Sequence, residues 1–239
     1  MTDTAILLVG GRGTRLGSLT DQTPKPLLEV AGRPFIFHLL EHLASQGIAR
    51  VTLATGYLAS QFYAVVGSRC CGLGVQYSNE DAPLGTGGAI THAFRQFESR
   101  RAFALNGDTL FKTDLPALEK VHEMREAAFS LVLRQVADVS RYGAIACLDD
   151  QVTAIHEKGP VGPGFINGGV YLIERSPLLA VAPAGAFSLE NELLPKWVNE
   201  GIVAGIRSDA YFIDIGIPDD LARAQKDLAR RPATVQPES

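Results

Sequence analysis

The sequence has little of what several classes of protein require. It contains no apolar run near the roughly 20 residues that span a bilayer, and no basic stretch leads into an apolar core at its amino terminus. Its three cysteines, Cys70, Cys71 and Cys147, are too few and too irregularly spaced for a disulfide framework or the usual zinc patterns. We therefore expect a cytoplasmic protein with three reduced thiols and no membrane partner.

An excess of basic charge is also absent. The 22 Lys and Arg residues against 26 Asp and Glu residues give a net charge of −4, which argues against a broad surface for nucleic acid. With 46% hydrophobic and 20% charged residues, the composition is that of an ordinary globular protein. At 239 residues the chain can form one large core, so we predict a single domain over 1–230 and a flexible tail over 231–239.

Buried strands and helices alternate in the first half of the chain. The aliphatic run Ala5–Val9 is short and ends at glycine, as a buried parallel strand should. Further strands are expected at 50–54, 75–78 and 102–105, and helices at 34–46, 58–66 and 86–97. This rhythm predicts an α/β fold with a doubly wound, mostly parallel, Rossmann-like sheet.

The second half has shorter strands separated by turns. Strands are expected at 130–136, 142–148, 152–156, 167–172 and 211–213, and helices at 115–125, 190–200 and 218–230. These strands predict a small antiparallel lobe added to the sheet.

A glycine loop follows the first strand, where open α/β sheets bind ligands. It reads Gly10-Gly11-Arg12-Gly13-Thr14-Arg15-Leu16, and Pro24-Lys25-Pro26 comes shortly after. Backbone N–H groups in such a loop can approach a phosphate closely, and basic side chains can neutralise it. The loop lacks the third glycine of a dinucleotide fingerprint and the Gly-Lys-Ser/Thr of a P-loop. It therefore predicts another kind of polyphosphate site, with a solvated turn as the alternative.

Further motifs follow in order along the chain. They are Leu-Gly-Thr-Gly-Gly-Ala at 84–89, Asn-Gly-Asp at 106–108, Glu-Lys at 157–158, Asn-Gly-Gly at 167–169 and Asp-Ile-Gly at 214–216. With the first loop and Pro-Lys-Pro, they resemble the sugar-1-phosphate nucleotidylyltransferases over residues 5 to about 226. The resemblance implies an enzyme that transfers a nucleotidyl group from a nucleoside triphosphate to a sugar 1-phosphate and releases pyrophosphate.

The resemblance also implies a nucleotide-binding half over residues 1 to about 110, a sugar-phosphate-binding half over about 111 to 230, and a Mg²⁺ site. Arg15 is expected on the leaving phosphates and Lys25 near the α-phosphate, because positioning and charge stabilisation dominate such transfers. Asp108 and Asp214 are expected to bind Mg²⁺, a hard cation that prefers oxygen ligands. The expected nucleotide-binding residues are Leu8, Val9, Gly10, Gly11, Gly13, Thr14, Arg15, Lys25, Glu80, Gly85, Thr86, Gly87 and Gly88.

On the acceptor side, the resemblance implies that Glu157 accepts hydrogen bonds from sugar hydroxyls and that Lys158 pairs with the sugar phosphate. An ordinary exposed charge pair is the alternative. The expected sugar-phosphate-binding residues are Asn106, Gly107, Tyr142, Gly143, Glu157, Lys158, Asn167 and Gly168. No general base is required, because a phosphate monoester with a second pKa of about 6 is already ionised at neutral pH.

Three segments favour one branch of the family. Val-Ser-Arg-Tyr-Gly at 139–143, Phe-Ser-Leu-Glu at 187–190 and Tyr-Phe-Ile-Asp-Ile-Gly at 211–216 are similar to members that use GTP and D-glycero-α-D-manno-heptose 1-phosphate. Family members that use UTP with N-acetylmuramic acid 1-phosphate or another hexose 1-phosphate are the alternative, and a non-catalytic nucleotide-sugar sensor is a remote one. Homo-oligomer formation is possible and stays open.

Overall fold

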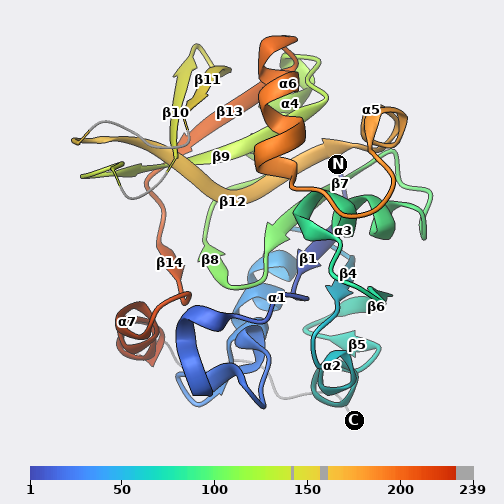
Figure 1. The fold of residues 1–239 in the computed structure, drawn as a ribbon, viewed down its shortest axis with the longest axis vertical. Helices are drawn as coiled ribbons and strands as arrows, with labels where there is room; N and C mark the ends of the chain where they lie inside the picture. The colour runs from blue at the N-terminus through green and yellow to red at the C-terminus, as the bar shows by residue number, and fades with distance from the viewer. Residues whose placement is uncertain (141–142, 157–160, 230–239) are drawn as a thin grey trace. The chain divides into compact units, whose positions relative to one another are not determined.

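The computed structural model describes residues 1–140, 143–156 and 161–229 (Figure 1). The expected tail at 231–239 and the end of the expected last helix lie outside these residues. The chain divides into two compact units. Unit 1 comprises Met1–Thr2, Leu84–Ala104 and Phe111–Tyr211, and unit 2 comprises Asp3–Pro83, Leu105–Leu110 and Phe212–Ser239.

Unit 2 contains a short parallel sheet. Strands β1 (Thr4–Leu8), β4 (Arg50–Thr55) and β6 (Leu73–Asn79) pair in parallel in that order, and β5 (Arg69–Cys70) adds an antiparallel edge. Ile6 and Leu53 are fully buried, as expected for strands covered on both faces. The parallel arrangement predicted for the first half is confirmed for these strands.

The helices of unit 2 follow the sequence signals. Helix α1 (Phe35–Ser45) begins directly after Pro34, and unit 2 also contains α2 (Ala59–Val66) and α7 (Pro218–Ala229). Two 3₁₀ turns, η1 (Thr14–Thr20) and η2 (Lys25–Leu27), carry Arg15 and Lys25 respectively. A small hairpin of β2 (Glu29–Val30) and β3 (Arg33–Pro34) leads into α1, and β14 (Phe212–Asp214) precedes α7.

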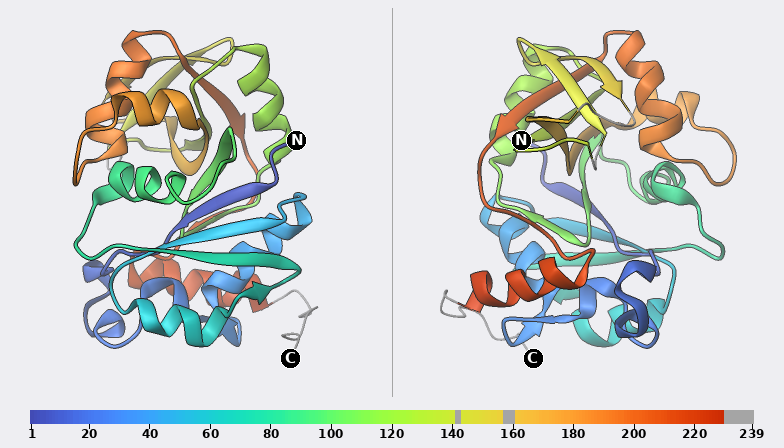
Figure 2. Two further views of the ribbon diagram at one scale, coloured as in Figure 1. Left: turned by 90° about the vertical axis from the view of Figure 1, so that its right-hand side faces the viewer. Right: turned by 60° about the vertical axis from the view of Figure 1, so that its left-hand side comes forward.

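Unit 1 contains a mixed sheet, so the expectation of a mostly parallel sheet is not confirmed, although the expected antiparallel strands are present in this half of the chain. Its strands run in the order β10 (Ala144–Leu148), β11 (Gln151–His156), β13 (Val203–Ser208), β9 (Phe129–Val136) and β12 (Gly164–Glu174). Strands β13 and β9 pair in parallel, whereas the pairs β10–β11, β11–β13 and β12–β9 are antiparallel. Figure 2 shows the β10–β11 hairpin in yellow beside β13. The fold is therefore α/β with a mixed arrangement of strands.

Strand β13 was not expected from the sequence. Gly205 interrupts its apolar pattern, and a glycine inside a strand usually weakens it. A Cβ atom at Gly205 would lie 3.0 Å from Val152 Cγ2 and 3.2 Å from Leu133 Cδ1. The glycine therefore allows close packing between neighbouring side chains, which a single sequence does not reveal.

The helices of unit 1 are α3 (Gly85–Phe94), α4 (Leu115–Met124), α5 (Arg175–Val181) and α6 (Leu194–Asn199). The helix expected at 190–200 is divided, because residues Leu189–Leu193 form a π-helical turn before α6. Helix α5 was missed, since it is short and contains Pro177. Strands β7 (Arg101–Asn106) and β8 (Thr109–Phe111) have residues in both units.

The core of unit 1 is built on aromatic packing. Phe129 lies 5.3 Å from Tyr171 and 5.9 Å from Trp197, measured between ring centroids.

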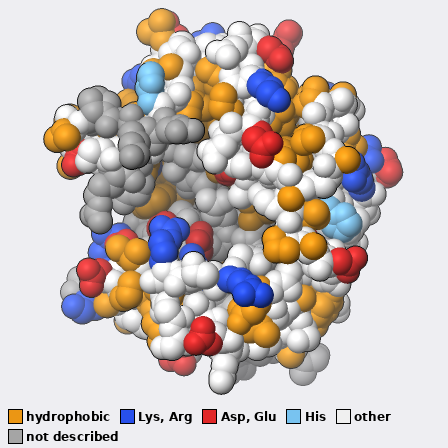
Figure 3. Space-filling model, viewed as in Figure 1, with side chains coloured by type: hydrophobic (Ala, Val, Ile, Leu, Met, Phe, Trp, Pro, Cys, Tyr) orange, Lys and Arg blue, Asp and Glu red, His pale blue; other side chains and the backbone are white. Residues whose placement is uncertain are grey.

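Basic and acidic side chains are interspersed on the face shown in Figure 3. No helix within 1–140, 143–156 or 161–229 is long and apolar enough to cross a membrane.

Candidate active site

Lys25 and Asp108 form an ion pair in unit 2. The prolines on either side of Lys25 restrict its backbone, and the η2 turn directs its side chain inward, where it is 7% exposed. Its Nζ atom lies 2.7 Å from Asp108 Oδ2. The hydroxyl of Thr109 donates to the other carboxylate oxygen at 3.1 Å. Two of the four residues expected to be catalytic are therefore in direct contact.

Asp214 is the last residue of strand β14 and lies close to Asp108 in unit 2. The backbone N–H of Ile215 donates to Asp108 O at 3.0 Å, which joins the two aspartate segments. The Gly216 N–H donates to Asp214 Oδ1 at 2.6 Å. Burial and the nearby charge of Asp108 raise the pKa of Asp214 above its ordinary value, although Lys25 acts in the opposite direction. Asp108 and Asp214 thus form a pair of neighbouring carboxylates that a cation would stabilise.

Arg15 lies beside this pair. Gly13, whose φ of 65° suits glycine, begins the η1 turn that carries Arg15. A Cβ atom at Gly216 would lie 3.6 Å from Arg15 Nη2 and 2.8 Å from Asp214 Oδ1. Arg15, Lys25, Asp108 and Asp214 therefore lie together in unit 2, although they come from four separate segments.

A small cleft of about 60 Å³ opens at this cluster. Its lining includes both charged partners, Lys25 and Asp108, and backbone of the first glycine loop. The lining residues are Leu8, Val9, Gly11, Gly13, Lys25, Pro26 and Asp108. A glycine loop beside a buried ammonium group is suited to phosphate. Of the remaining nucleotide-binding candidates, Gly10, Thr14 and Glu80 also belong to unit 2.

The residues of this cluster fit a magnesium ion. Mg²⁺ is usually held by one or two carboxylates together with substrate phosphates and water. Within the described parts of the chain, no group of three or more His, Cys, Asp or Glu side chains could hold a metal. Asp108 and Asp214 therefore fit a metal that completes its coordination with substrate oxygens, rather than one enclosed by protein.

The second glycine loop, in unit 1, packs against Phe187. The N–H groups of Gly87 and Gly88 donate to Phe187 O at 3.1 and 3.4 Å, and Phe187 N donates to Leu84 O at 2.9 Å. A Cβ atom at Gly87 would lie 2.1 Å from the Phe187 ring, and one at Gly85 would lie 2.5 Å from Phe187 O. Close approach of Phe187 thus accounts for glycine at these positions, and two of the loop's N–H groups bond within the protein.

The expected acceptor residues are distributed between the units. Gly143 and Asn167 line a pocket of about 510 Å³ in unit 1, whereas Asn106 and Gly107 belong to unit 2. Gly168 packs under Phe111, because a Cβ atom there would lie 2.6 Å from that ring. The other expected residues, Tyr142, Glu157 and Lys158, lie outside the described residues. The pocket is lined by Gly143, Ile145, Ile155, His156, Ile166, Asn167, Glu190, Asn191, Leu194 and Pro195.

Glu190 is a charged residue of this pocket that is not among the expected acceptor residues. Phe-Ser-Leu-Glu at 187–190 indicates a branch of the family but does not by itself indicate a role for its carboxylate. In the structure Glu190 accepts hydrogen bonds from Thr86, Tyr171 and Ser188. The sequence shows only a carboxylate at the end of this motif, and two of its partners, Thr86 and Tyr171, lie 104 and 19 residues away.

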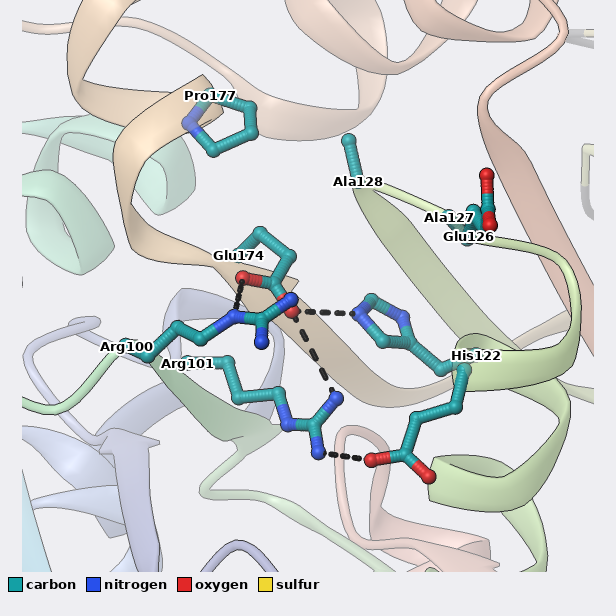
Figure 4. A pocket seen from close by; sticks show the side chains of 9 residues that line it. Arg100, Arg101, His122, Glu126, Ala127, Ala128, Glu174 and Pro177 are labelled. Atoms are coloured by element: carbon teal, nitrogen blue, oxygen red, sulfur yellow. Dashed lines mark hydrogen bonds and ion pairs between the residues drawn. The ribbon is translucent and has the colours of Figure 1, made fainter.

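A further hollow of about 490 Å³ in unit 1 contains charged groups that pair with one another (Figure 4). Arg101 contacts Glu119 at 3.0 Å, Glu174 at 3.7 Å and also Glu123. Arg100 Nε donates to Glu174 Oε2 at 3.0 Å. The partly buried Arg101 is therefore neutralised by carboxylates of the protein, which indicates a stabilising role for this residue.

Comparison with known proteins identifies the family. Residues 4–231 match the family model described as nucleotidyl transferase. The chain therefore belongs to the nucleotidyl transferase family, as the ordered motifs predicted.

Relatives of the chain include sugar-1-phosphate guanylyltransferases. The chain is 41% identical to D-glycero-alpha-D-manno-heptose 1-phosphate guanylyltransferase of Aneurinibacillus thermoaerophilus, over 94% of this chain and 97% of that protein. It is 37% identical to mannose-1-phosphate guanylyltransferase of Mycobacterium tuberculosis, over 95% of this chain and 64% of that relative. The crystal structure of HddC from Yersinia pseudotuberculosis complexed with GMP-PN has a TM-score of 0.83 and 34% identity, covering 95% of this chain and all of HddC.

Proposed function

We propose that this chain transfers GMP from GTP to D-glycero-α-D-manno-heptose 1-phosphate, giving GDP-heptose and pyrophosphate. The structural observation that carries this proposal is the cluster of Lys25, Asp108, Asp214 and Arg15. The similarity to heptose 1-phosphate guanylyltransferase over nearly the whole of both chains supports the choice of substrates.

In the proposed mechanism, an ionised phosphate oxygen of the sugar 1-phosphate attacks the α-phosphorus of GTP in line. The new O–P bond forms as the bond to the β-phosphate oxygen breaks, and that oxygen leaves with pyrophosphate. Lys25 would stabilise charge on the α-phosphate, and Arg15 would stabilise the leaving phosphates. Asp108 and Asp214 would hold Mg²⁺, which supplies further positive charge beside the phosphates when bound.

Recognition of guanine is assigned to Glu80 in this proposal. Guanine presents N1–H and an amino group, two donors that a carboxylate can accept. Glu80 is half-buried in unit 2, and its backbone N–H donates to Thr55 O at 2.9 Å. This bond fixes the backbone from which the carboxylate extends.

The sugar phosphate is assigned to the unit 1 pocket, with Asn167 as a hydrogen-bonding residue. Tyr142, Glu157 and Lys158 remain proposed acceptor ligands on the basis of the motif resemblance. Mannose 1-phosphate is a second candidate acceptor, supported by the similarity to the mycobacterial enzyme.

Pyrophosphate release tests the proposal directly. GTP, UTP, ATP and dTTP are each combined with the 1-phosphates of heptose, mannose, glucose and N-acetylmuramic acid. The proposal expects the highest kcat/KM with GTP and the heptose. Preference for mannose 1-phosphate would show that the acceptor sugar is mannose. Preference for UTP with N-acetylmuramic acid 1-phosphate would contradict the guanylyltransferase assignment. No turnover with any pair would favour the nucleotide-sugar sensor.

A further inference from the structure

Glu190 lies at the centre of a hydroxyl network in unit 1. One carboxylate oxygen, Oε1, accepts from the Tyr171 hydroxyl at 3.2 Å. The other oxygen, Oε2, accepts from Thr86 Oγ1 and, at 3.2 Å, from Ser188 Oγ. Three donors thus converge on one carboxylate. Since a carboxylate offers about four lone-pair positions, one acceptor position remains for a further donor.

The network fixes the direction of each hydrogen bond as far as Asn167. The single hydroxyl hydrogen of Tyr171 is donated to Glu190, so the Tyr171 oxygen can only accept from Asn167 Nδ2, which lies at 2.8 Å. Asn167 Oδ1 accepts from Gly169 N at 2.9 Å, which supports the same amide orientation. The second hydrogen of Nδ2 is then available as a donor from a residue that lines the pocket.

Glu190 and Asn167 line the same pocket, whose remaining walls are largely aliphatic. The pocket therefore combines an anionic acceptor with a neutral donor. A sugar hydroxyl can donate to the former and accept from the latter, whereas a phosphate group is repelled by the carboxylate. This pairing favours the hydroxyl-bearing part of a sugar phosphate beside Glu190.

We propose that Glu190 binds a hydroxyl of the acceptor sugar and, through Tyr171, holds Asn167 in the orientation that donates to the same sugar. This inference rests on the proposed function, because it assigns the unit 1 pocket to the sugar. Through Thr86, the same carboxylate also fixes the second glycine loop, since Thr86 Oγ1 accepts from Leu189 N at 3.0 Å.

Substitution of Glu190 with glutamine separates these contributions. The amide oxygen can still accept from Thr86 and Ser188, but an NH₂ group at the Oε1 position would donate to Tyr171. The Tyr171 hydroxyl hydrogen would then face the Asn167 donor, which must turn away. We expect Glu190→Gln to raise the KM for the sugar 1-phosphate about tenfold, with the KM for GTP changing less than about twofold.

Glu192→Gln is the matched control. Glu192 lies in the same π-helical turn and accepts from Ser188 N at 2.8 Å, but it does not line the pocket. It should leave the KM for the sugar phosphate unchanged. Thermal unfolding of both variants establishes that they are folded. Tyr171→Phe removes the hydroxyl that links Glu190 to Asn167 and should also raise the KM for the sugar 1-phosphate. It serves as the test if Glu190→Gln does not fold.

A double-mutant cycle with Asn167→Ala tests the coupling. Because Glu190 acts partly through Asn167, the two substitutions together should raise the KM for the sugar phosphate by less than the product of their separate effects. An unchanged KM in folded Glu190→Gln, an equal rise in Glu192→Gln, or fully multiplicative effects would each overturn the proposal while wild-type turnover still supported the proposed function. Absence of turnover by the wild type with every substrate pair would instead contradict the proposed function, and the role of Glu190 with it.

Discussion

Lys25 Nζ lies 2.7 Å from Asp108 Oδ2, although 83 positions separate the two residues in the sequence. The lysine is almost fully buried, so its ammonium group depends on this carboxylate and on any bound phosphate for stabilisation. The same carboxylate is a proposed metal ligand. We therefore expect that binding of substrate and metal replaces the contact between Lys25 and Asp108 with contacts from Lys25 to phosphate and from Asp108 to the metal.

Asp108→Asn is expected to reduce turnover far more than stability. The amide keeps the size of the side chain but removes the charge needed for Mg²⁺, and we expect kcat at limiting Mg²⁺ to fall by about 10²- to 10³-fold. Steady-state pyrophosphate release at several Mg²⁺ concentrations measures this effect, and thermal unfolding provides the control. Near-normal turnover at limiting Mg²⁺ would contradict the assignment of Asp108.

Asp214→Asn should separate stability from function. Burial and Asp108 disfavour the charged form of Asp214, whereas asparagine can still accept from Gly216 N. Without Mg²⁺ we therefore expect the variant to have a Tm about 2–4 °C above that of the wild type, which corresponds to about 1 kcal/mol.

Added Mg²⁺ and GTP should raise the Tm of the wild type more than that of Asp214→Asn, because binding to the folded state stabilises it. Differential scanning calorimetry with EDTA and with Mg²⁺ measures both effects. Equal stabilisation of the two proteins by Mg²⁺ would argue against Asp214 as a ligand.

Gly87→Ala should destabilise the protein through Phe187. The new methyl group would lie 2.1 Å from the Phe187 ring, and we expect a loss of about 1–3 kcal/mol in the free energy of unfolding. Gly11→Ala is the matched control, since a Cβ atom there meets no described atom within 4 Å. Urea unfolding measures both, and Phe187→Ala should reduce the additional cost of Gly87→Ala. Equal costs for the two glycine substitutions would contradict the packing explanation.

His122 makes unit 1 sensitive to mild acid. Burial lowers the pKa of His122 below the ordinary value of about 6.5, and the charge of Arg101 acts in the same direction, whereas Glu174 and Glu119 oppose them. His122 Nδ1 lies 2.7 Å from Ser130 Oγ, and Nε2 lies 3.4 Å from Glu174 Oε1.

The unfolded chain therefore takes up a proton at His122 before the folded chain does. The free energy of unfolding should fall as the pH decreases below about 6.5, until the lower folded-state pKa is reached. Urea unfolding between pH 7.5 and 5.5 measures this slope, which should be smaller in His122→Gln. His92→Gln, which removes another histidine of unit 1, is the control. An identical slope in wild type and His122→Gln would refute the prediction.

Cys70 and Cys71 should react as a pair. Their Sγ atoms lie 3.5 Å apart and both side chains are half-buried. A trivalent arsenical oxide can bond to both sulfurs with loss of water, whereas the separate Cys147 offers only one. We expect one phenylarsine oxide per protein by intact mass, with Cys147 still open to alkylation. Unchanged binding in Cys70→Ala would contradict the pairing.

Much of the candidate site could be predicted because its residues occupy ordered motifs at strand ends. The motifs predict Arg15, Lys25, Asp108 and Asp214 as site residues, and these four lie together in unit 2. Their contact could not be measured from the sequence, and their catalytic roles stay predictions.

The strand arrangement of unit 1 was harder to predict, because packing overrides local pattern. Gly205 weakens the signal of β13 yet permits its contacts with Leu133 and Val152. The network around Glu190 depends on Thr86 and Tyr171, which are 104 and 19 residues away from it. Neither feature has a local signature that would distinguish it from an ordinary loop.

Gly107 brings the chain before Asp108 close to strand β1. Its N–H donates to Leu8 O at 2.9 Å, and a Cβ atom there would lie 2.6 Å from that same oxygen. The Asp108 carboxylate is therefore carried at a separation from β1 that is set by one backbone hydrogen bond. Substitutions elsewhere on the surface of unit 2 can alter solubility or charge without changing the separation between β1 and the Asp108 carboxylate.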